Sequence, residues 1–457
     1  MDVSTQLKTR GPVFTPGHAG YASELAGYNR LITHRPTLVV GARHATDVVA
    51  AVRYATEIGQ SVGVQATGHG PSVPADGVLI STRRMRHIEV HPGDRTVTVG
   101  AGVVSRDILA ALVPHGLVPL GGSSPDVGVV GYHLGGGIPL LGRRFGYAAD
   151  RVRSLEVVTA DGQQRTVTVE SEPELFWAML GCRGNFGVVT ALTTEVIPLA
   201  TLVGGGLWFT GDAIAPALRT YVEWSATVPE EMSSSVLLMR MPDLNGVPEP
   251  LRGRRIAHVR IAYLGDPGTA NRLLHPLRAA APAVMDTVDE LPASQLASIH
   301  GEPPGPVTFE ARNTLLGRLD AVAVDRLLDH AGVAGDDDYL VELRHLGGAF
   351  GPSASSRAVI GRRDGEFILY TGSRLHPLTG DEAASAQDHL HRAMLPWSTG
   401  GITPAFLSGP RVTTSQLRTG YGDGDYRRLT EIKATWDPDN LFRINHNVPP
   451  YTPRGRG

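Results

Sequence analysis

Two glycine-rich segments hold the residues of this chain best suited to binding a phosphorylated ligand. The first reads QATGHGPSVPADG over residues 65–77 and places His69 between Gly68 and Gly70. The second reads GGSSPDVGVVGYHLGGGIPLLGRRFG over residues 121–146. Glycine adopts positive φ and lets backbone N–H groups approach an anion closely. We therefore expect the two loops together to cradle a pyrophosphate, with His69 in contact with the molecule that carries it.

Strands and helices must position these loops. Short apolar runs bounded by turn residues predict strands over residues 35–42, 61–66, 78–82, 87–92 and 96–102. Apolar periodicity predicts a helix over 46–59 that starts at Thr46 and Asp47, and a second over 105–116. Ser105 is the expected N-cap of the second helix, and Gly116 its stop. Neither loop has the strand–GxGxxG–helix order of a nicotinamide-binding Rossmann fold, which we reject.

The pattern changes after Pro198. Strand-like and helix-like segments alternate up to about residue 400, which predicts an antiparallel sheet with helices on one face. With 457 residues the chain is long enough for two domains. We therefore expect an α+β protein.

Composition excludes several classes of function. A net charge of −3 gives no general attraction to nucleic acid or to an anionic membrane. The start of the chain lacks the apolar core of a signal peptide, and no apolar run is long enough to span a membrane. The one cysteine, Cys182, excludes an intramolecular disulfide and a cysteine-cluster metal site, and the 17 histidines include no HExxH pattern. We expect a soluble cytoplasmic enzyme without a metal site.

From about residue 35 to 200 the chain resembles the FAD-binding domain of the vanillyl-alcohol-oxidase type flavoproteins, the PCMH-type fold. More narrowly, it resembles the bacterial berberine-bridge-enzyme-like oxidases. The resemblance is carried in the family's order by RPTLVVGARHATDVVAAVRYA, ATGHG, GLVPLGGSSPDVGVVGYHLGGGI, RRFGYAAD, VVTADG, ELFWAML, GNFGVVTAL and, near the C-terminus, YGDGDYRRLTEIKATWDPDNLFRINHNVPP. It implies a lead-in over 1–34, an FAD-binding domain over 35–200, a substrate domain over 201–404, and a segment over 405–457 that returns to the FAD domain.

The resemblance implies that His69 bonds covalently to the 8α-methyl carbon of FAD. Many relatives have a second link through a cysteine, but Ser124 occupies that position here. A serine hydroxyl is a far weaker nucleophile than a thiolate, and Cys182 lies in a different loop. We therefore expect FAD with a single covalent link.

The family motifs also name the residues expected to contact FAD. The glycine loops should line the pyrophosphate and ribityl chain, and residues 185–189 should close the adenine side. A valine at the position of Val127 goes with oxygen access in the family, which favours an oxidase. The expected set is Thr67, Gly68, His69, Gly70, Pro71, Ser123, Ser124, Val127, Gly128, Gly131, Tyr132, Gly135, Gly136, Gly137, Gly187, Val188, Val189, Asn445 and Asn447.

Oxidation of an alcohol or an activated C–H bond also needs a base to take up a proton. Relatives use a tyrosine or carboxylate from the substrate domain or the C-terminal segment, which makes Tyr370 and Tyr421 the candidates. Ala405 and Phe406 stand where the family often has an Asn-Tyr or Asn-Phe pair, so a phenolate base is not expected at that position. The helical periodicity around Tyr426 indicates packing.

The sequence as a whole predicts an FAD-dependent oxidoreductase acting on a small organic or natural-product substrate, with O2 as acceptor. Three alternatives remain open. They are a flavoprotein that catalyses a non-redox cyclisation or elimination with structural FAD, a dehydrogenase with another acceptor, and a flavin-binding protein that sequesters a ligand. The substrate, its stereochemistry and the oligomeric state do not follow from the sequence.

Overall fold

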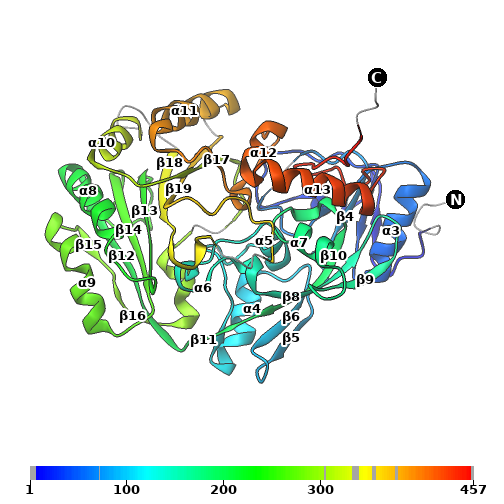
Figure 1. The fold of residues 1–457 in the computed structure, drawn as a ribbon, viewed down its shortest axis with the longest axis horizontal. Helices are drawn as coiled ribbons and strands as arrows, with labels where there is room; N and C mark the ends of the chain where they lie inside the picture. The colour runs from blue at the N-terminus through cyan, green and yellow to red at the C-terminus, as the bar shows by residue number, and fades with distance from the viewer. Residues whose placement is uncertain are drawn as a thin grey trace.

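A computed structural model describes residues 7–70, 73–302, 305–331, 339–352, 357–375 and 379–453. Within these residues no helix combines the length and apolarity needed to cross a lipid bilayer. The described residues form two larger sheets and the small β7–β11 pair in the N-terminal half and one large sheet in the second half, and the C-terminal helices return to the first half (Figure 1).

The first sheet has the order β1-β2-β4-β3 and delivers the chain to the His69 loop. Its strands are β1 (Val13–Phe14), β2 (Leu38–Gly41), β3 (Val62–Gln65) and β4 (Val78–Ser81). β2, β4 and β3 are parallel, and α3 (Ala45–Glu57) connects β2 to β3. The helix begins one residue earlier than predicted, with His44 as N-cap, and the Asp47 carboxylate accepts hydrogen bonds from the amides of Arg10 and Gly11. Asp47 thereby fixes the incoming chain to the helix start as well as capping it.

The second sheet is antiparallel and has the order β5-β6-β10-β8-β9. Its strands are β5 (Ile88–His91), β6 (Thr96–Gly100), β8 (Val152–Val158), β9 (Gln164–Val167) and β10 (Val188–Glu195). Between β6 and β10 lie α4 (Ser105–Leu112), η1 (Val113–His115), β7 (Leu117–Val118), α5 (Val129–Leu134), α6 (Gly142–Phe145), η2 (Ala148–Arg151), α7 (Pro173–Met179) and η3 (Arg183–Asn185). The predicted N-cap of α4 was wrong by one residue. Val104 is the cap, and the Ser105 hydroxyl instead donates to the Val127 carbonyl.

The large sheet is antiparallel and occupies the second half of the chain. Its order is β15-β12-β14-β13-β18-β19-β17, with β16 also paired to β12. The strands are β12 (Thr201–Thr210), β13 (Met232–Arg240), β14 (Arg255–Tyr263), β15 (Met285–Asp286), β16 (Asp289–Pro292), β17 (Phe309–Leu316), β18 (Tyr339–His345) and β19 (Phe367–Arg374). The helices α8 (Ile214–Ser225), α9 (Pro267–Ala280), α10 (Ala321–His330) and α11 (Gly380–Ala393) lie on its outer side (Figure 1). The expected α+β class and the antiparallel sheet are confirmed.

Short elements complete the chain. β11 (Ile197–Pro198) pairs with β7 ahead of the large sheet. The others are α2 (Tyr21–Leu25), η4 (Gly211–Ala213), η5 (Ala293–Ile299), η6 (Gly348–Phe350), η7 (Leu395–Trp397), η8 (Pro404–Phe406), α12 (Thr414–Tyr421) and α13 (Asp423–Trp436). α12 and α13 pack into the apolar core of the N-terminal half through residues such as Leu417 and Leu429. The C-terminal segment therefore belongs physically to the first half of the fold.

A buried ion pair fixes this return. The Lys433 ammonium lies 2.6 Å from Asp437 Oδ2 and donates to the carbonyls of Asn185 and Phe442, and both charged side chains are 0% exposed. Asp437 also accepts hydrogen bonds from the amides of Leu441 and Phe442. One side chain thus joins α13, the turn at residue 185 and the segment after residue 440.

We predict that Lys433→Met lowers the free energy of unfolding by about 3–5 kcal/mol, because it leaves the Asp437 carboxylate buried without its cation. The matched control is Arg427→Met, which breaks an exposed pair with Glu431 at the same i,i+4 spacing on the same helix. That pair is screened by water and should contribute little. Thermal and urea denaturation would measure both variants, and equal midpoints would contradict the role given to Lys433.

Candidate functional site

A cavity of about 430 Å³ runs between the glycine-rich loops and the large sheet. The first half contributes residues from the His69 loop, the 122–138 segment and the 183–189 segment. The sheet contributes Phe309, Ala311, Arg344 and Tyr370, and the C-terminal part contributes residues 405–408, 444 and 445. Segments far apart in the sequence therefore meet around one space.

Most of the predicted cofactor residues line this cavity. Those present are Thr67, Gly68, His69, Gly70, Ser123, Ser124, Val127, Gly128, Gly131, Tyr132, Gly135, Gly137, Gly187, Val188, Val189 and Asn445. Gly136 and Asn447 are not among the lining residues, and Pro71 lies outside the described residues. Of the two candidate bases, Tyr370 lines the cavity and Tyr421 does not.

The His69 loop is held in place by residues 27–29. The amides of Tyr28 and Asn29 donate to the carbonyls of Thr67 and Gly68. Gly68 has φ +70°, and a Cβ added there would lie 2.7 Å from the Gly27 Cα. A side chain at residue 68 is therefore excluded both by backbone conformation and by this close approach.

His69 is a neutral imidazole with one unused ring nitrogen. Its Nδ1 lies 3.1 Å from the Thr67 hydroxyl, and its ring stacks on Tyr28 with centroids 3.7 Å apart. Burial lowers the pKa of His69 to about 4, against an opposing effect of Asp126. Nε2 is buried and has no hydrogen-bond partner in the described part of the chain. Since such a polar atom is costly to bury alone, the site fits a group that contacts or bonds to this ring.

The loop with Ser124 separates the cavity from a second hollow. Ser124 is buried, and Val127 lines the cavity three residues later. The Val127 carbonyl accepts hydrogen bonds from the amide and hydroxyl of Ser105, which attaches this loop to the start of α4. Cys182 is buried, does not line the cavity, and has a thiol pKa raised to about 12 by burial. Its thiol is therefore protonated at neutral pH and a poor nucleophile.

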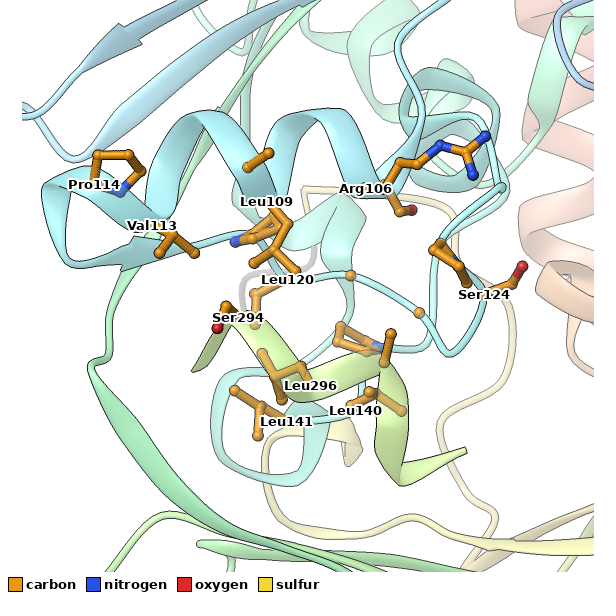
Figure 2. A pocket seen from close by; sticks show the side chains of 18 residues that line it. Arg106, Leu109, Val113, Pro114, Leu120, Ser124, Leu140, Leu141, Ser294 and Leu296 are labelled. Atoms are coloured by element: carbon orange, nitrogen blue, oxygen red, sulfur yellow. The ribbon is translucent and has the colours of Figure 1, made fainter. Parts of the chain in front are cut away.

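The second hollow, of about 390 Å³, lies between α4 and η5 (Figure 2). Leu109 of α4 and Val113 of η1 face Leu296 of η5 across it, with Leu120 and Leu140 beside them. This hollow shares Gly122 and Ser124 with the first cavity. Its lining is mostly apolar and lacks His69, so the first cavity is the candidate site for a phosphorylated cofactor.

The large sheet places a tyrosine and an arginine over the cavity. Tyr370 on β19 is paired across strands with Glu342 on β18, and its ring lies 5.1 Å from that of Phe406. The Arg344 guanidinium lies 5.2 Å from the Phe406 ring and donates to the Glu342 carboxylate at 3.1 Å. Burial raises the pKa of Tyr370 far above its ordinary value, although Arg344 acts in the opposite direction. Tyr370 is therefore a neutral phenol at physiological pH.

Tyr421, the second candidate base, lies away from this cavity. Its hydroxyl donates to the Gly181 carbonyl at 2.9 Å, and its ring is buried in the core. It therefore supports the turn before Arg183 and is not among the residues that line the cavity. Tyr426, expected to pack, is buried on α13.

The sequence did not identify two arginines that line the cavity, Arg183 and Arg344. Arg344 and Glu342 lie two residues apart on β18 and therefore on the same face of the strand. This pair of opposite charges within a predicted strand could have indicated a functional position. Arg183 lies just before the GNFGVV segment and has no comparable signal, since its position depends on a turn. In the described ranges, no group of three or more histidine, cysteine or acidic side chains could hold a metal ion.

Comparison with known proteins finds two matching family models. The family described as "FAD binding domain" matches residues 36–168, and the family "Berberine and berberine like" matches residues 417–449. Among curated proteins, the (R)-6-hydroxynicotine oxidase of Paenarthrobacter nicotinovorans is 26% identical over 98% of both chains. An FAD-linked oxidoreductase of Dictyostelium discoideum is 25% identical over 96% of this chain and 95% of that protein.

Solved structures share the fold. The crystal structure of 6-hydroxy-D-nicotine oxidase from Arthrobacter nicotinovorans has a TM-score of 0.85 and 23% identity, and covers 97% of this chain and 99% of that one. A chitooligosaccharide oxidase has a TM-score of 0.86 and 20% identity, with 98% of each chain covered. At these identities the likeness is one of architecture, and it confirms the expected fold.

The position of Tyr421 leads to a prediction. Tyr421→Phe should lower stability by about 1 kcal/mol, because the Gly181 carbonyl loses its hydrogen bond. It should leave the rate of FAD reduction by a substrate unchanged, because the hydroxyl does not reach the cavity. Thermal denaturation and anaerobic stopped-flow absorbance would measure the two effects. A large loss of reduction rate at an unchanged melting temperature would show that Tyr421 acts in the reaction.

Proposed function

Because this chain belongs to the berberine-bridge-enzyme-like FAD-linked oxidoreductases, we propose that it is an oxidase that holds FAD through one covalent bond to His69. It would remove a hydride from an alcohol or activated C–H bond of a small organic substrate and use O2 as acceptor. The observation that carries the proposal is the His69 ring in the first glycine-rich loop, whose buried Nε2 has no hydrogen-bond partner among the described residues and whose pKa is lowered to about 4 by burial.

The residues around the cavity fit FAD. The glycine loops offer backbone N–H groups to a pyrophosphate, and the neutral His69 ring is the nucleophilic form of the imidazole. Ser124 leaves this side of the cavity without a thiol, which supports a single link. FAD, when bound, supplies a hydride acceptor that can pass its electrons on to O2.

Tyr370 is the proposed proton acceptor for the substrate. Its ring lies at the sheet side of the cavity, and the nearby Arg344 guanidinium would stabilise the phenolate formed when it loses its proton. In the reaction the substrate carbon gives up a hydride, and the substrate O–H gives its proton to a basic group. The raised pKa of Tyr370 makes this group a base mainly at alkaline pH.

O2 as acceptor is supported by the resemblance of the segment around Val127 to oxidases, and by a valine side chain at the cavity wall. The relatives' names suggest where to start a substrate screen, with hydroxynicotines and oligosaccharides. A glucose dehydrogenase shares the same fold, so reoxidation in air has to be measured.

The proposed covalent bond between His69 and FAD can be tested with His69→Ala. The parent protein should keep its flavin when denatured in acid, and its intact mass should equal the chain plus one FAD. The variant should release all its flavin on denaturation, because no bond remains. Ser124→Ala is the control, and it should keep the tether. Release of flavin from the parent itself would remove the claim of a covalent link.

A second prediction concerns turnover. Anaerobic mixing with a true substrate should bleach the visible flavin band, and admitting air should restore it with release of hydrogen peroxide. Tyr370→Phe should slow bleaching by about 10²–10⁴-fold if a general base is lost. In the parent, kcat/KM should rise with pH across the accessible range, because the pKa of Tyr370 is raised, and this rise should be absent from the variant.

Several outcomes would contradict the proposal. Bleaching without reoxidation in air would indicate a dehydrogenase. Product formation without bleaching would indicate a non-redox reaction with structural FAD. An unchanged pH profile in Tyr370→Phe would exclude Tyr370 as the base and leave the oxidase proposal intact.

A further inference from the structure

Arg183 occupies a backbone conformation that its side chain disfavours. Its φ is +56°, in the left-handed region, where a residue with a Cβ is strained. Few described residues other than glycine share this region, and these are Lys8, Arg95 and Asn440. A strained residue at a cavity wall points to a function that repays the strain.

The strain brings a guanidinium into the cavity without a carboxylate partner. In the described part of the chain Arg183 forms no ion pair, whereas Arg344, the other arginine that lines this cavity, is bound to Glu342. Arg183 is half-buried at the cavity wall. Burial lowers the pKa of Arg183, and among the described residues Tyr421 and Cys182, both neutral at physiological pH, act in the opposite direction. A positive charge taken partly out of water beside carbonyl groups and no carboxylate favours an anion next to it.

The hydrogen bonds of Arg183 use one edge of the guanidinium. Nη2 donates to the Leu407 carbonyl at 2.7 Å and lies within 3.3 Å of the Pro404 and Ala405 carbonyls. Nε and Nη1 form no hydrogen bond with the described residues. The three carbonyl groups thus orient the Arg183 guanidinium and leave Nε and Nη1 able to donate to a ligand.

Those remaining donors face the two glycine loops. A Cβ added at Gly70 would lie 3.7 Å from Nη1, and one added at Gly135 would lie 3.6 Å from Nε. The guanidinium therefore sits between the loop of His69 and the loop after Gly131, where backbone N–H groups can also point at an anion. A planar fork whose Nε and Nη1 are both left to donate matches a phosphate in geometry and charge.

We infer that Arg183 binds the pyrophosphate of FAD and acts as the cation that neutralises it between the two loops. This inference rests on the proposed FAD site, but it does not depend on the substrate or on O2. The strained conformation of Arg183 then serves to bind a ligand, and FAD affinity depends on a residue outside the two glycine-rich loops.

The test compares Arg183→Gly with its parent in a His69→Ala background, where FAD binds reversibly. Glycine removes the guanidinium and relieves the positive φ. FAD and riboflavin are the probes, since riboflavin carries the flavin ring but no phosphate. We expect FAD affinity to fall by about tenfold or more, and riboflavin affinity to change by less than about threefold. Fluorescence quenching of each flavin would measure both dissociation constants.

Melting temperatures give a second readout that is independent of activity. Without FAD, Arg183→Gly should melt no lower than its parent, because strain and an unpaired charge are both removed. With saturating FAD, its stabilisation should be smaller than that of the parent. Arg95→Gly is the matched control, since it relieves a similar φ of +52° at an exposed turn. It should leave both flavin affinities unchanged.

The remaining possible results would contradict either the role of Arg183 or the proposed function. Equal loss of FAD and riboflavin binding, or no loss of either, would show that Arg183 does not bind the pyrophosphate. A fall in melting temperature without FAD and with unchanged FAD affinity would make Arg183 a structural clamp on residues 404–407. If Arg183→Gly fails to fold, Arg183→Gln decides, because it removes the charge and keeps a side chain of similar length, and unchanged FAD affinity there contradicts the inference. Failure of the parent to bind FAD would instead refute the proposed function.

Discussion

The buried Lys433 ammonium is the interaction on which the cavity depends. It binds the Asn185 carbonyl in the turn that carries Arg183, and the Phe442 carbonyl in the segment that leads to Asn445. Both segments line the same cavity. An uncompensated charge at this depth would be very costly, so Asp437 and the carbonyls must all be in place together. The same contacts of Lys433 therefore position this wall of the cavity and stabilise the docking of the C-terminal segment on the first half of the fold.

The charged groups on the two sides of the cavity have different partners. On the sheet side, Arg260 and Arg344 approach the same carboxylate, Glu342, at 3.5 and 3.1 Å. On the loop side, the Arg183 guanidinium donates to carbonyl oxygens and to no carboxylate of the described residues, and burial lowers the pKa of His69 to about 4. The loop side thus offers donors and a nucleophilic nitrogen, while the sheet side offers a compensated network next to Tyr370. Under the proposed function, this asymmetry separates the part assigned to the cofactor from the part assigned to the substrate.

Local sequence signals predicted the elements better than their arrangement. The early strands and α3 follow from apolar runs and breakers, and the His69 loop was found because glycine and histidine stand together in the chain. The insertion of β10 between β6 and β8 could not be predicted, because strand order depends on contacts distant in sequence. The same limit explains Ser105, whose hydroxyl bonds to Val127 rather than to its own helix.

For the candidate site, too, the sequence indicated residue types better than their positions. Tyr370 and Tyr421 were equivalent candidates in sequence, but sheet register brings Tyr370 to the cavity and helix packing places Tyr421 against Gly181. Arg183 was missed because its position follows from a positive φ, and arginine itself carries no signal for one. Residue type predicted the chemistry, and long-range backbone geometry decided which residues can take part.

The walls of the cavity extend from Asn29 to Asn445, nearly the whole length of the chain. Asn29 pairs with Phe309 through both its amide nitrogen and its carbonyl oxygen, and Val62 donates to the Leu441 carbonyl. During synthesis on the ribosome, a nascent chain that still lacks residues 441–445 has the His69 loop but not the whole wall of the cavity. A product terminated before these residues would therefore leave the space beside His69 open on that side.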